Sequence, residues 1–237
     1  MIKEALEYIV GLSRPELVEK NGSVWSDRRL SRVNWNPKAQ PIEMSTLTSL
    51  IDYIKSKTDA MDNMIVHVVS PLEVRLFSAL DKDRVRETLV AVEGQVPDFK
   101  YGQYINHEEF LVALQSKFLD SEERAGLLAF VGNVENGSVS SYGDDGVSQK
   151  ATVKTGVVSR EDKIVPNPVK LRPFRTFVEA EQPASDFVFR MRDDGRGGVQ
   201  CAIFEADGGA WKNCAMESIK DYLKQELEEF KNFTVIS

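Results

Sequence analysis

The sequence has very few of the residues on which many enzyme and metal sites depend. Its 237 residues include only two cysteines and two histidines. Cys201 and Cys214 are too few for a structural zinc site, and Gly143-Asp144-Asp145-Gly146 is an ordinary turn sequence with no second carboxylate motif. A Ser-His-Asp triad is likewise disfavoured, because it needs a histidine and the sequence has only two. The sequence therefore favours a binding protein over an enzyme, although carboxylate or arginine chemistry stays open, and we expect no metal and no cofactor.

Long apolar runs and an excess of positive charge are missing as well. No stretch approaches the about 18 consecutive apolar residues of a membrane-spanning helix. The first residues, MIKEALEYIVGL, form a charged amphipathic pattern without a cleavage site, so we expect a cytosolic protein with no membrane partner. The net charge of −7 disfavours broad capture of nucleic acid, although a local basic groove is compatible with it.

What the chain does have is enough apolar material for a core, because 42% of its residues are hydrophobic and 28% are charged. Strand patterns cluster in groups and helical patterns come in pairs, without regular alternation of strand and helix. This order predicts an α+β fold with mainly antiparallel sheet in meanders, packed against helices, with a C-terminal amphipathic helix. We treat 1–237 as a single domain. A passage rich in Gly, Ser and Asn at 132–146 marks where a division into 1–131 and 147–237 would fall.

Short local patterns predict individual elements. Asn21-Gly22 between apolar arms indicates a type I′ hairpin, and Leu30 with Val33 suggests a third strand after it. Ser45 is the predicted N-cap of a helix, and Asn106 with Glu109 resembles a capping box. The predicted apolar stripe of the first of these helices consists of Leu47, Leu50, Ile51 and Ile54.

The segment from 173 to 230 is predicted to form three strands followed by a helix. If 182–185 and 193–198 are hairpin loops, one face of the three strands is continuously apolar, and a one-residue slip would destroy that face. The predicted pairs are Ala180 with Phe187, Val178 with Phe189, Thr176 with Met191, Phe204 with Phe187 and Ala202 with Phe189. The residues expected to pack under the final helix are Val178, Phe187, Phe189 and Phe204.

The opposite face of these strands gathers positive charge. The register places Arg175 opposite Arg192, with Arg190 on the same face. Neighbouring like charges cost free energy unless an anion lies between them, so one interpretation is a site for phosphate or another anion. The other interpretation is ion pairing with acidic neighbours on the same strands, which is common on exposed sheets and weak. Those neighbours are Glu179, Glu181, Asp186 and Glu205.

The turn between the last strand and the helix contains Gly208 and Gly209. Glycines at such a turn expose N–H groups at a helix N-terminus, where an anion is favoured, and Trp211 offers a ring on which a base would stack. The alternative is a tight turn capped by Asp207 or a neighbour, with Trp211 packed on the sheet. The candidate ligand-binding residues are Arg172, Arg175, Arg190, Arg192, Arg196, Gly208, Gly209 and Trp211.

Several stretches of the sequence also carry a family resemblance. They are RTFVEAEQPASDFVFRM followed by IFEADGGAWK, the upstream GDDGVSQKATVKTGV, and the earlier LTSLIDYIK and MIVHVVSPLEVRLFSAL. Over most of the chain, the sequence resembles a YfdQ-like family of bacteriophage and prophage proteins of unknown function, in the version from phages of Gram-positive hosts. The resemblance implies a phage origin and a location in the cytoplasm of the infected bacterial host. It implies no catalytic residue.

Two functions are compatible with these features. The first is a phage-encoded, non-enzymatic binding protein, an oligomeric sponge that sequesters a small anionic nucleotide-like immune signal of the host. The phage setting suggests the immune signal, and the arginines suggest the anion. The alternative is a phage DNA-metabolism, recombination or structural accessory that contacts another protein, or single-stranded DNA through arginines beside Phe177 and Trp211. Val188 and Ile203 on the arginine face predict a homo-oligomer.

Overall fold

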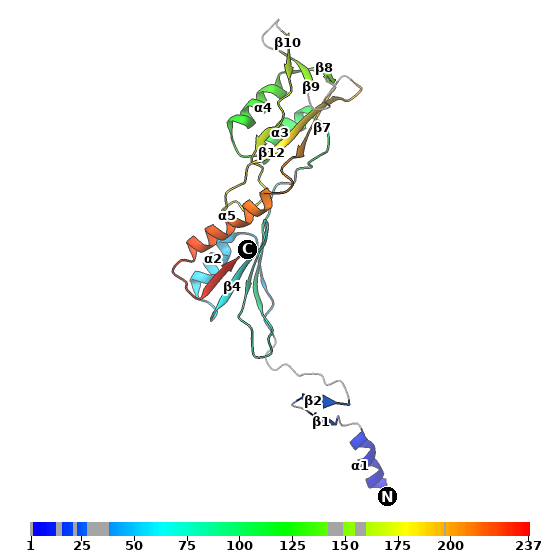
Figure 1. Cartoon of the computed structure of the whole chain (residues 1–237), viewed down its shortest axis with the longest axis vertical. Coiled ribbons are helices and arrows are strands. Elements are labelled where there is room, and N and C mark those ends of the chain that lie inside the picture. Colours follow the sequence, from blue (N-terminus) through cyan, green and yellow to red (C-terminus); the bar gives the residue numbers. More distant parts are fainter. Residues whose placement is uncertain are drawn as a thin grey trace. The chain divides into compact units, whose positions relative to one another are not determined.

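The computed structural model describes residues 2–12, 16–20, 23–27, 38–141, 149–154, 160–196 and 198–237. The chain divides into two units, Met1–Lys38 and Ala39–Ser237. The fold is α+β with mainly antiparallel pairing and a C-terminal helix, as predicted (Figure 1). The predicted third strand near Leu30 and the Asp144-Asp145 turn lie outside the described residues.

The first unit contains a helix and a hairpin. Helix α1 (Ile2–Leu12) precedes strands β1 (Leu17–Lys20) and β2 (Ser23–Ser26), which pair antiparallel. Lys20 pairs with Ser23, so two residues link the strands, which confirms the hairpin predicted from Asn21-Gly22. Apolar side chains such as Leu6 and Trp25 are exposed in this unit.

The second unit contains a five-stranded sheet in the order β14-β4-β5-β6-β3. The central strands β4, β5 and β6 pair antiparallel, and the outer strands β14 and β3 run parallel to their neighbours. Alternate residues of β4 point to one buried face, as a strand's two-residue period requires. The strands are β3 (Ile42–Met44), β4 (Met64–Ser70), β5 (Glu73–Phe77), β6 (Thr88–Glu93) and β14 (Phe233–Ile236).

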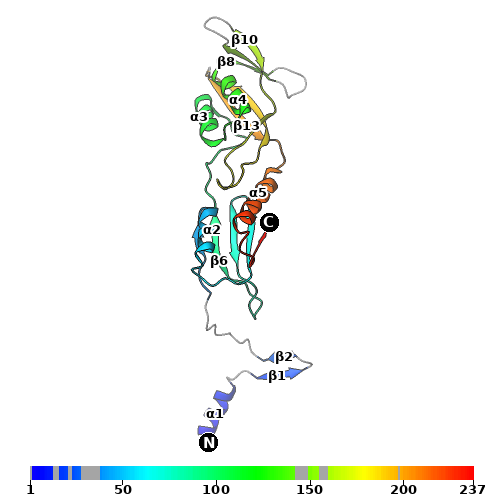
Figure 2. The same ribbon diagram turned by 90° about the vertical axis from the view of Figure 1, so that its left-hand side faces the viewer.

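Two helices cover the buried face of this sheet. Helices α2 (Leu47–Ser56) and α5 (Trp211–Glu226) pack against each other and against the sheet (Figures 1 and 2). The predicted apolar stripe of α2 is buried in full. The core they share includes Leu47, Leu50, Ile51, Ile54, Met64, Val66, Val68, Val74, Leu76, Val90, Val92, Phe177, Ala180, Ile219, Leu223 and Leu227.

A second core lies between a four-stranded antiparallel sheet and two further helices. The sheet order is β11-β12-β13-β7, formed by Val169–Leu171, Ser185–Asp193, Val199–Glu205 and Ile105–Asn106. Helices α3 (His107–Lys117) and α4 (Glu122–Gly132) pack on it through residues such as Phe110 and Val131. A three-stranded sheet, β10-β9-β8, is formed by Arg160–Ile164, Gln149–Lys154 and Val134–Ser141.

Each core takes residues from both sides of the 132–146 passage. Phe110 and Phe189 belong to one core, and Leu50 and Leu223 belong to the other. The single domain and the division at this passage stay predictions.

The predicted strand at 173–181 is wrong. Residues 174–184 form no strand, and the partner of β12 on that side is β11. The reason is Gln182, a buried side chain that takes over the hydrogen bonds a neighbouring strand would make. Its Oε1 accepts from the N–H groups of Arg175 (3.0 Å) and Thr176 (3.2 Å), and its Nε2 donates to the carbonyl of Phe177 (2.9 Å). The segment is therefore folded around one amide side chain.

The predicted register of β12 and β13 is wrong by one residue. Phe187 pairs with Glu205 and Phe189 with Ile203, so Ile203 faces the core and Phe204 faces the other side of the sheet. The predicted packing under the final helix is also wrong. Phe187 and Phe189 pack in the core with α3 and α4, and Val178 is 72% exposed.

The N-cap residues of three helices can be compared with the predicted ones. Asn106 and Ser121 cap α3 and α4 by accepting from N–H groups three residues later, which for Asn106 confirms the prediction. The predicted cap of α2 is off by one residue, because Thr46 Oγ1, not Ser45, accepts from the N–H of Ser49 at 3.1 Å.

We therefore expect Thr46→Ala to lower the free energy of unfolding by about 1 kcal/mol. Ser45→Ala is the matched control and should change it by less than about 0.5 kcal/mol. Urea denaturation of both variants measures the difference, and equal losses would contradict the assignment of Thr46 as the cap.

Candidate functional site

Arg175 is the most buried of the predicted ligand-binding arginines. The residue is 6% exposed and lies at the meeting point of β12, β13 and the start of α5. Its guanidinium carbon lies 4.0 Å from the centroid of the Trp211 ring and 5.6 Å from that of Phe187. A planar guanidinium stacks well on aromatic faces, so two of the predicted site residues, Arg175 and Trp211, do come together.

The charge of Arg175 is balanced by the protein itself. Its Nη1 donates to Glu205 Oε1 at 2.8 Å, and its Nη2 donates to Ser185 Oγ and lies 3.8 Å from Asp207 Oδ2. Burial lowers the pKa of Arg175, while nearby Tyr101, Glu205 and Asp207 act in the opposite direction. Ion pairing, the alternative to an anion site, is therefore what the structure shows for this arginine.

The glycine turn is likewise occupied by a carboxylate of the chain. Gly208 and Gly209 have φ values of 63° and 83°, a conformation that favours glycine. Asp207 Oδ1 accepts from the N–H of Gly209 at 3.0 Å, and its Oδ2 accepts from Ser185 Oγ at 2.5 Å. Burial works to raise the pKa of Asp207, but these hydrogen bonds and Arg175 outweigh it and hold the pKa below its usual range. Asp207 thus forms the tight turn of the alternative interpretation, whereas the N-cap residue of α5, Ala210, has no side-chain cap hydrogen bond.

Two other predicted arginines lie apart from this cluster. Arg172 forms an ion pair with Glu181, again as the alternative interpretation predicted. Arg196 is exposed in the turn between β12 and β13, where its N–H donates to Asp194 Oδ1 at 2.7 Å. The structure brings neither of them to Arg175.

The remaining two arginines share the outer face of the four-stranded sheet. Arg190 and Arg192 point away from the core, as their alternation with Phe189 and Met191 requires. The guanidinium carbon of Arg192 lies 4.1 Å from the centroid of the Tyr104 ring. The Tyr104 and Phe204 rings meet edge to face, with their centroids 6.3 Å apart. We call these four residues, Arg190, Arg192, Tyr104 and Phe204, the arginine–aromatic face.

Arg192 differs from Arg172 and Arg175 in the charge of its partners. Its Nε donates to the neutral side chain of Gln200 at 2.8 Å, directly across the pairing of β12 with β13. Within the described residues it forms no ion pair with a carboxylate. Arg192 is therefore a cation on an aromatic ring whose charge the described part of the chain leaves uncompensated.

Sequence reasoning missed the aromatic half of this face. The wrong register placed Phe204 in the core, and Tyr104 precedes β7 by a single residue, outside any strand pattern. The prediction that Phe177 would lie beside the arginines is wrong, since Phe177 is 3% exposed and belongs to the core of the five-stranded sheet. The sequence signal that could have found Phe204 is the alternation of Gln200, Ala202 and Phe204. In a register shifted by one residue from the predicted one, these three residues lie on the same face as the arginines.

Comparisons with other proteins add no assignment to this geometry. Searches against protein-family models, curated proteins and solved structures give no match. Over the described ranges, no helix is both long and apolar enough to cross a bilayer. The same ranges contain no group of three His, Cys, Asp or Glu side chains arranged to hold a metal ion. The functional argument therefore depends on the contacts of the site itself.

Removing the buried cation should destabilise the fold strongly. Arg175→Met would leave Glu205 and Asp207 without their countercharge, at an expected cost of about 3 to 5 kcal/mol in the free energy of unfolding. Arg172→Met, which breaks an exposed ion pair, should cost at most about 1 kcal/mol. Urea denaturation of the two variants tests this, and similar losses would contradict a structural role for Arg175.

The carboxylate of Asp207 predicts a loss of stability in acid. Because its pKa is lower in the folded than in the unfolded chain, its contribution is complete above the unfolded pKa of about 3.9. The contribution disappears as the pH falls toward the lowered folded value. The difference in unfolding free energy between wild type and Asp207→Asn should therefore be largest near neutral pH and shrink below about pH 4. A difference that stays constant with pH would contradict the lowered pKa.

Proposed function

We propose that this chain is a non-enzymatic binding protein that holds an anionic, nucleotide-like ligand on the arginine–aromatic face. The observation that carries the proposal is Arg192, whose guanidinium lies 4.1 Å from the Tyr104 ring and bonds a neutral amide rather than a carboxylate. Such a cation has charge to offer a ligand. Arg175, by contrast, is already neutralised by Glu205 and Asp207.

The chemistry of the face matches the two parts of a nucleotide. A guanidinium held against a ring keeps its edge available for two parallel hydrogen bonds to phosphate oxygens. Of the side-chain nitrogens of Arg192, Gln200 accepts a hydrogen bond only from Nε. The two terminal nitrogens of Arg192 form no hydrogen bond with the described residues. Tyr104 and Phe204 are half-buried, and a base would stack on whichever part of these rings is exposed.

The resemblance to YfdQ-like phage proteins supplies the setting of the proposal. In the cytoplasm of an infected bacterium, a protein with this face would act as a sponge for a nucleotide-derived immune signal. The scarcity of catalytic groups supports capture rather than turnover. The prediction of a homo-oligomer was based on Val188 and Ile203. Because Ile203 is buried in the core, the prediction now depends on Val188 alone, beside the arginines.

A second candidate function is contact with single-stranded DNA. The row formed by Arg192, Tyr104 and Phe204 along one sheet face suits stacking of successive bases. The net charge of −7 opposes it, because binding of a phosphate backbone depends on positive charge. This function is therefore tested beside the first.

The test is calorimetric titration with three probes: a cyclic dinucleotide, ADP-ribose and an oligothymidylate. We expect one of the two nucleotides to bind, and Arg192→Gln or Tyr104→Leu to weaken it about tenfold or more, since a hydrogen bond to a charged group contributes about 1.5 to 3 kcal/mol. Arg172→Gln is the matched control, because that arginine is paired with Glu181 away from the face. It should bind like wild type.

The remaining outcomes separate the alternatives. Binding of oligothymidylate alone, with strong salt dependence, would replace the first function by the second. Absence of binding by all three probes, or equal loss in the Arg172 and Arg192 variants, would contradict the arginine–aromatic face as a site. Ligand recovered chemically intact supports capture, whereas conversion would indicate an enzyme. A monomer in light scattering at micromolar concentration would contradict the homo-oligomer.

A further inference from the structure

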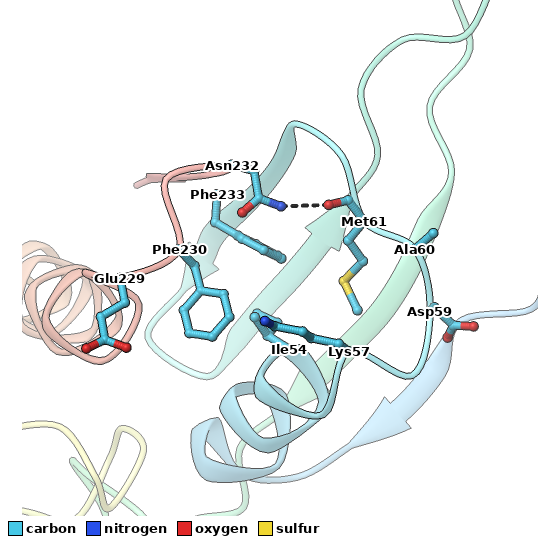
Figure 3. Close-up of a pocket in the computed structure, with 9 residues that line it drawn as sticks. All are labelled: Ile54, Lys57, Asp59, Ala60, Met61, Glu229, Phe230, Asn232 and Phe233. Carbon is cyan, nitrogen blue, oxygen red and sulfur yellow. Dashed lines mark hydrogen bonds between the residues drawn. The ribbon is translucent and has the colours of Figure 1, made fainter.

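The second unit also contains a cavity of about 460 Å³ between the end of α2 and the segment that joins α5 to β14 (Figure 3). It belongs to the five-stranded sheet and shares no lining residue with the arginine–aromatic face. Its size is in the range of small-molecule sites, about 300 to 1,000 Å³. It is lined by Ile54, Lys57, Asp59, Ala60, Met61, Glu229, Phe230, Asn232 and Phe233.

The walls of this cavity are held by hydrogen bonds and ring contacts. Asn232 Nδ2 donates to the carbonyl of Met61 at 2.6 Å (Figure 3). The carbonyl of Asn232 accepts from the N–H of Met64 at 2.8 Å. The Phe230 and Phe233 rings meet edge to face, with centroids 6.2 Å apart. Both chain segments that form the cavity are thus tied to each other before any ligand arrives.

Lys57 is the charged group that reaches into the cavity. It ends α2 in the left-handed conformation, with φ of 52°, where a helix usually has glycine. Figure 3 shows its side chain crossing the cavity toward Phe230, and the ammonium lies 6.0 Å from the centroid of that ring. The carboxylates of Asp59 and Glu229 point away from the cavity in the same view. Beside this cation, the lining includes the apolar side chains of Ile54, Met61, Phe230 and Phe233.

The ammonium of Lys57 has no carboxylate partner within the described part of the chain. Lys55, two residues earlier, pairs with Glu226 at 2.8 Å. Asp59 is engaged elsewhere, because its Oδ2 accepts from the hydroxyl of Tyr53 at 2.5 Å. Because Lys57 is exposed and has no ion pair in the described part of the chain, its ammonium can form a charge-assisted hydrogen bond with an anion that enters the cavity.

We propose that this cavity binds a small monocarboxylic acid with an apolar or aromatic body. Its carboxylate would pair with the Lys57 ammonium, and its body would lie among Met61, Phe230 and Phe233. The acidic rim formed by Asp59 and Glu229 disfavours polyanions such as nucleotides, so this ligand differs in class from that of the arginine–aromatic face. The proposal is independent of the function proposed above.

The test compares 3-phenylpropanoate with its alcohol, 3-phenylpropan-1-ol, by NMR of the protein labelled at the methionine methyl groups. We expect the acid to shift the Met61 resonance. The alcohol should bind with an affinity at least about tenfold lower, because it cannot form the charge-assisted hydrogen bond. Lys57→Met should lower the affinity for 3-phenylpropanoate to that for the alcohol. Lys57→Arg should retain binding, and Lys55→Met is the matched control that should behave like wild type.

Any of three results would overturn the proposal. The first is no shift at millimolar 3-phenylpropanoate, and the second is equal affinity for the acid and the alcohol. The third is a Lys57→Met protein, shown by circular dichroism to be folded, that binds the acid as tightly as wild type. Because Lys57 is exposed at a helix end, we expect both of its variants to fold.

Discussion

A buried guanidinium is costly unless it is paired and hydrogen-bonded, and this requirement shapes the centre of the second unit. Arg175 meets Glu205 at the end of β13 and Asp207 at the turn that leads into α5. Its guanidinium carbon also lies 4.0 Å from the centroid of the Trp211 ring and 5.6 Å from that of Phe187. One buried charge therefore joins the four-stranded sheet to the helix that covers the five-stranded sheet.

The segment around Arg175 is held in place by neutral side chains. Gln182 holds the backbone of this segment in a compact fold, and Thr176 Oγ1 donates to the carbonyl of Pro71 at 2.6 Å. Phe177 then enters the core of the five-stranded sheet, where its ring lies against Gly94 so closely that a Cβ there would approach it to 3.0 Å. A segment that our strand pattern placed in a hairpin instead links the two cores.

Partner charge divides the basic residues into structural and available ones. Arg172, Arg175 and Lys55 each face a carboxylate, so their charge is used within the fold. Arg192 and Lys57 instead lie near aromatic rings, without an ion pair in the described part of the chain. Their surroundings differ in turn, because Arg192 lies on a sheet face and Lys57 reaches into a cavity. The two proposed sites would therefore take anions of different size and polarity.

The sequence by itself determined the α+β class, the hairpin at Asn21-Gly22, the stripe of α2 and the Asn106 cap, because periodicity and capping act within a few residues. Only the tertiary structure decided the register of β12 with β13, since a slip by one residue exchanges the two faces and is set by contacts far apart in the chain. The same holds for Gln182 inside the 173–181 segment and for Tyr104 beside Arg192. Whether an arginine is neutralised depends on which side chains lie next to it, and these contacts form only in the folded chain.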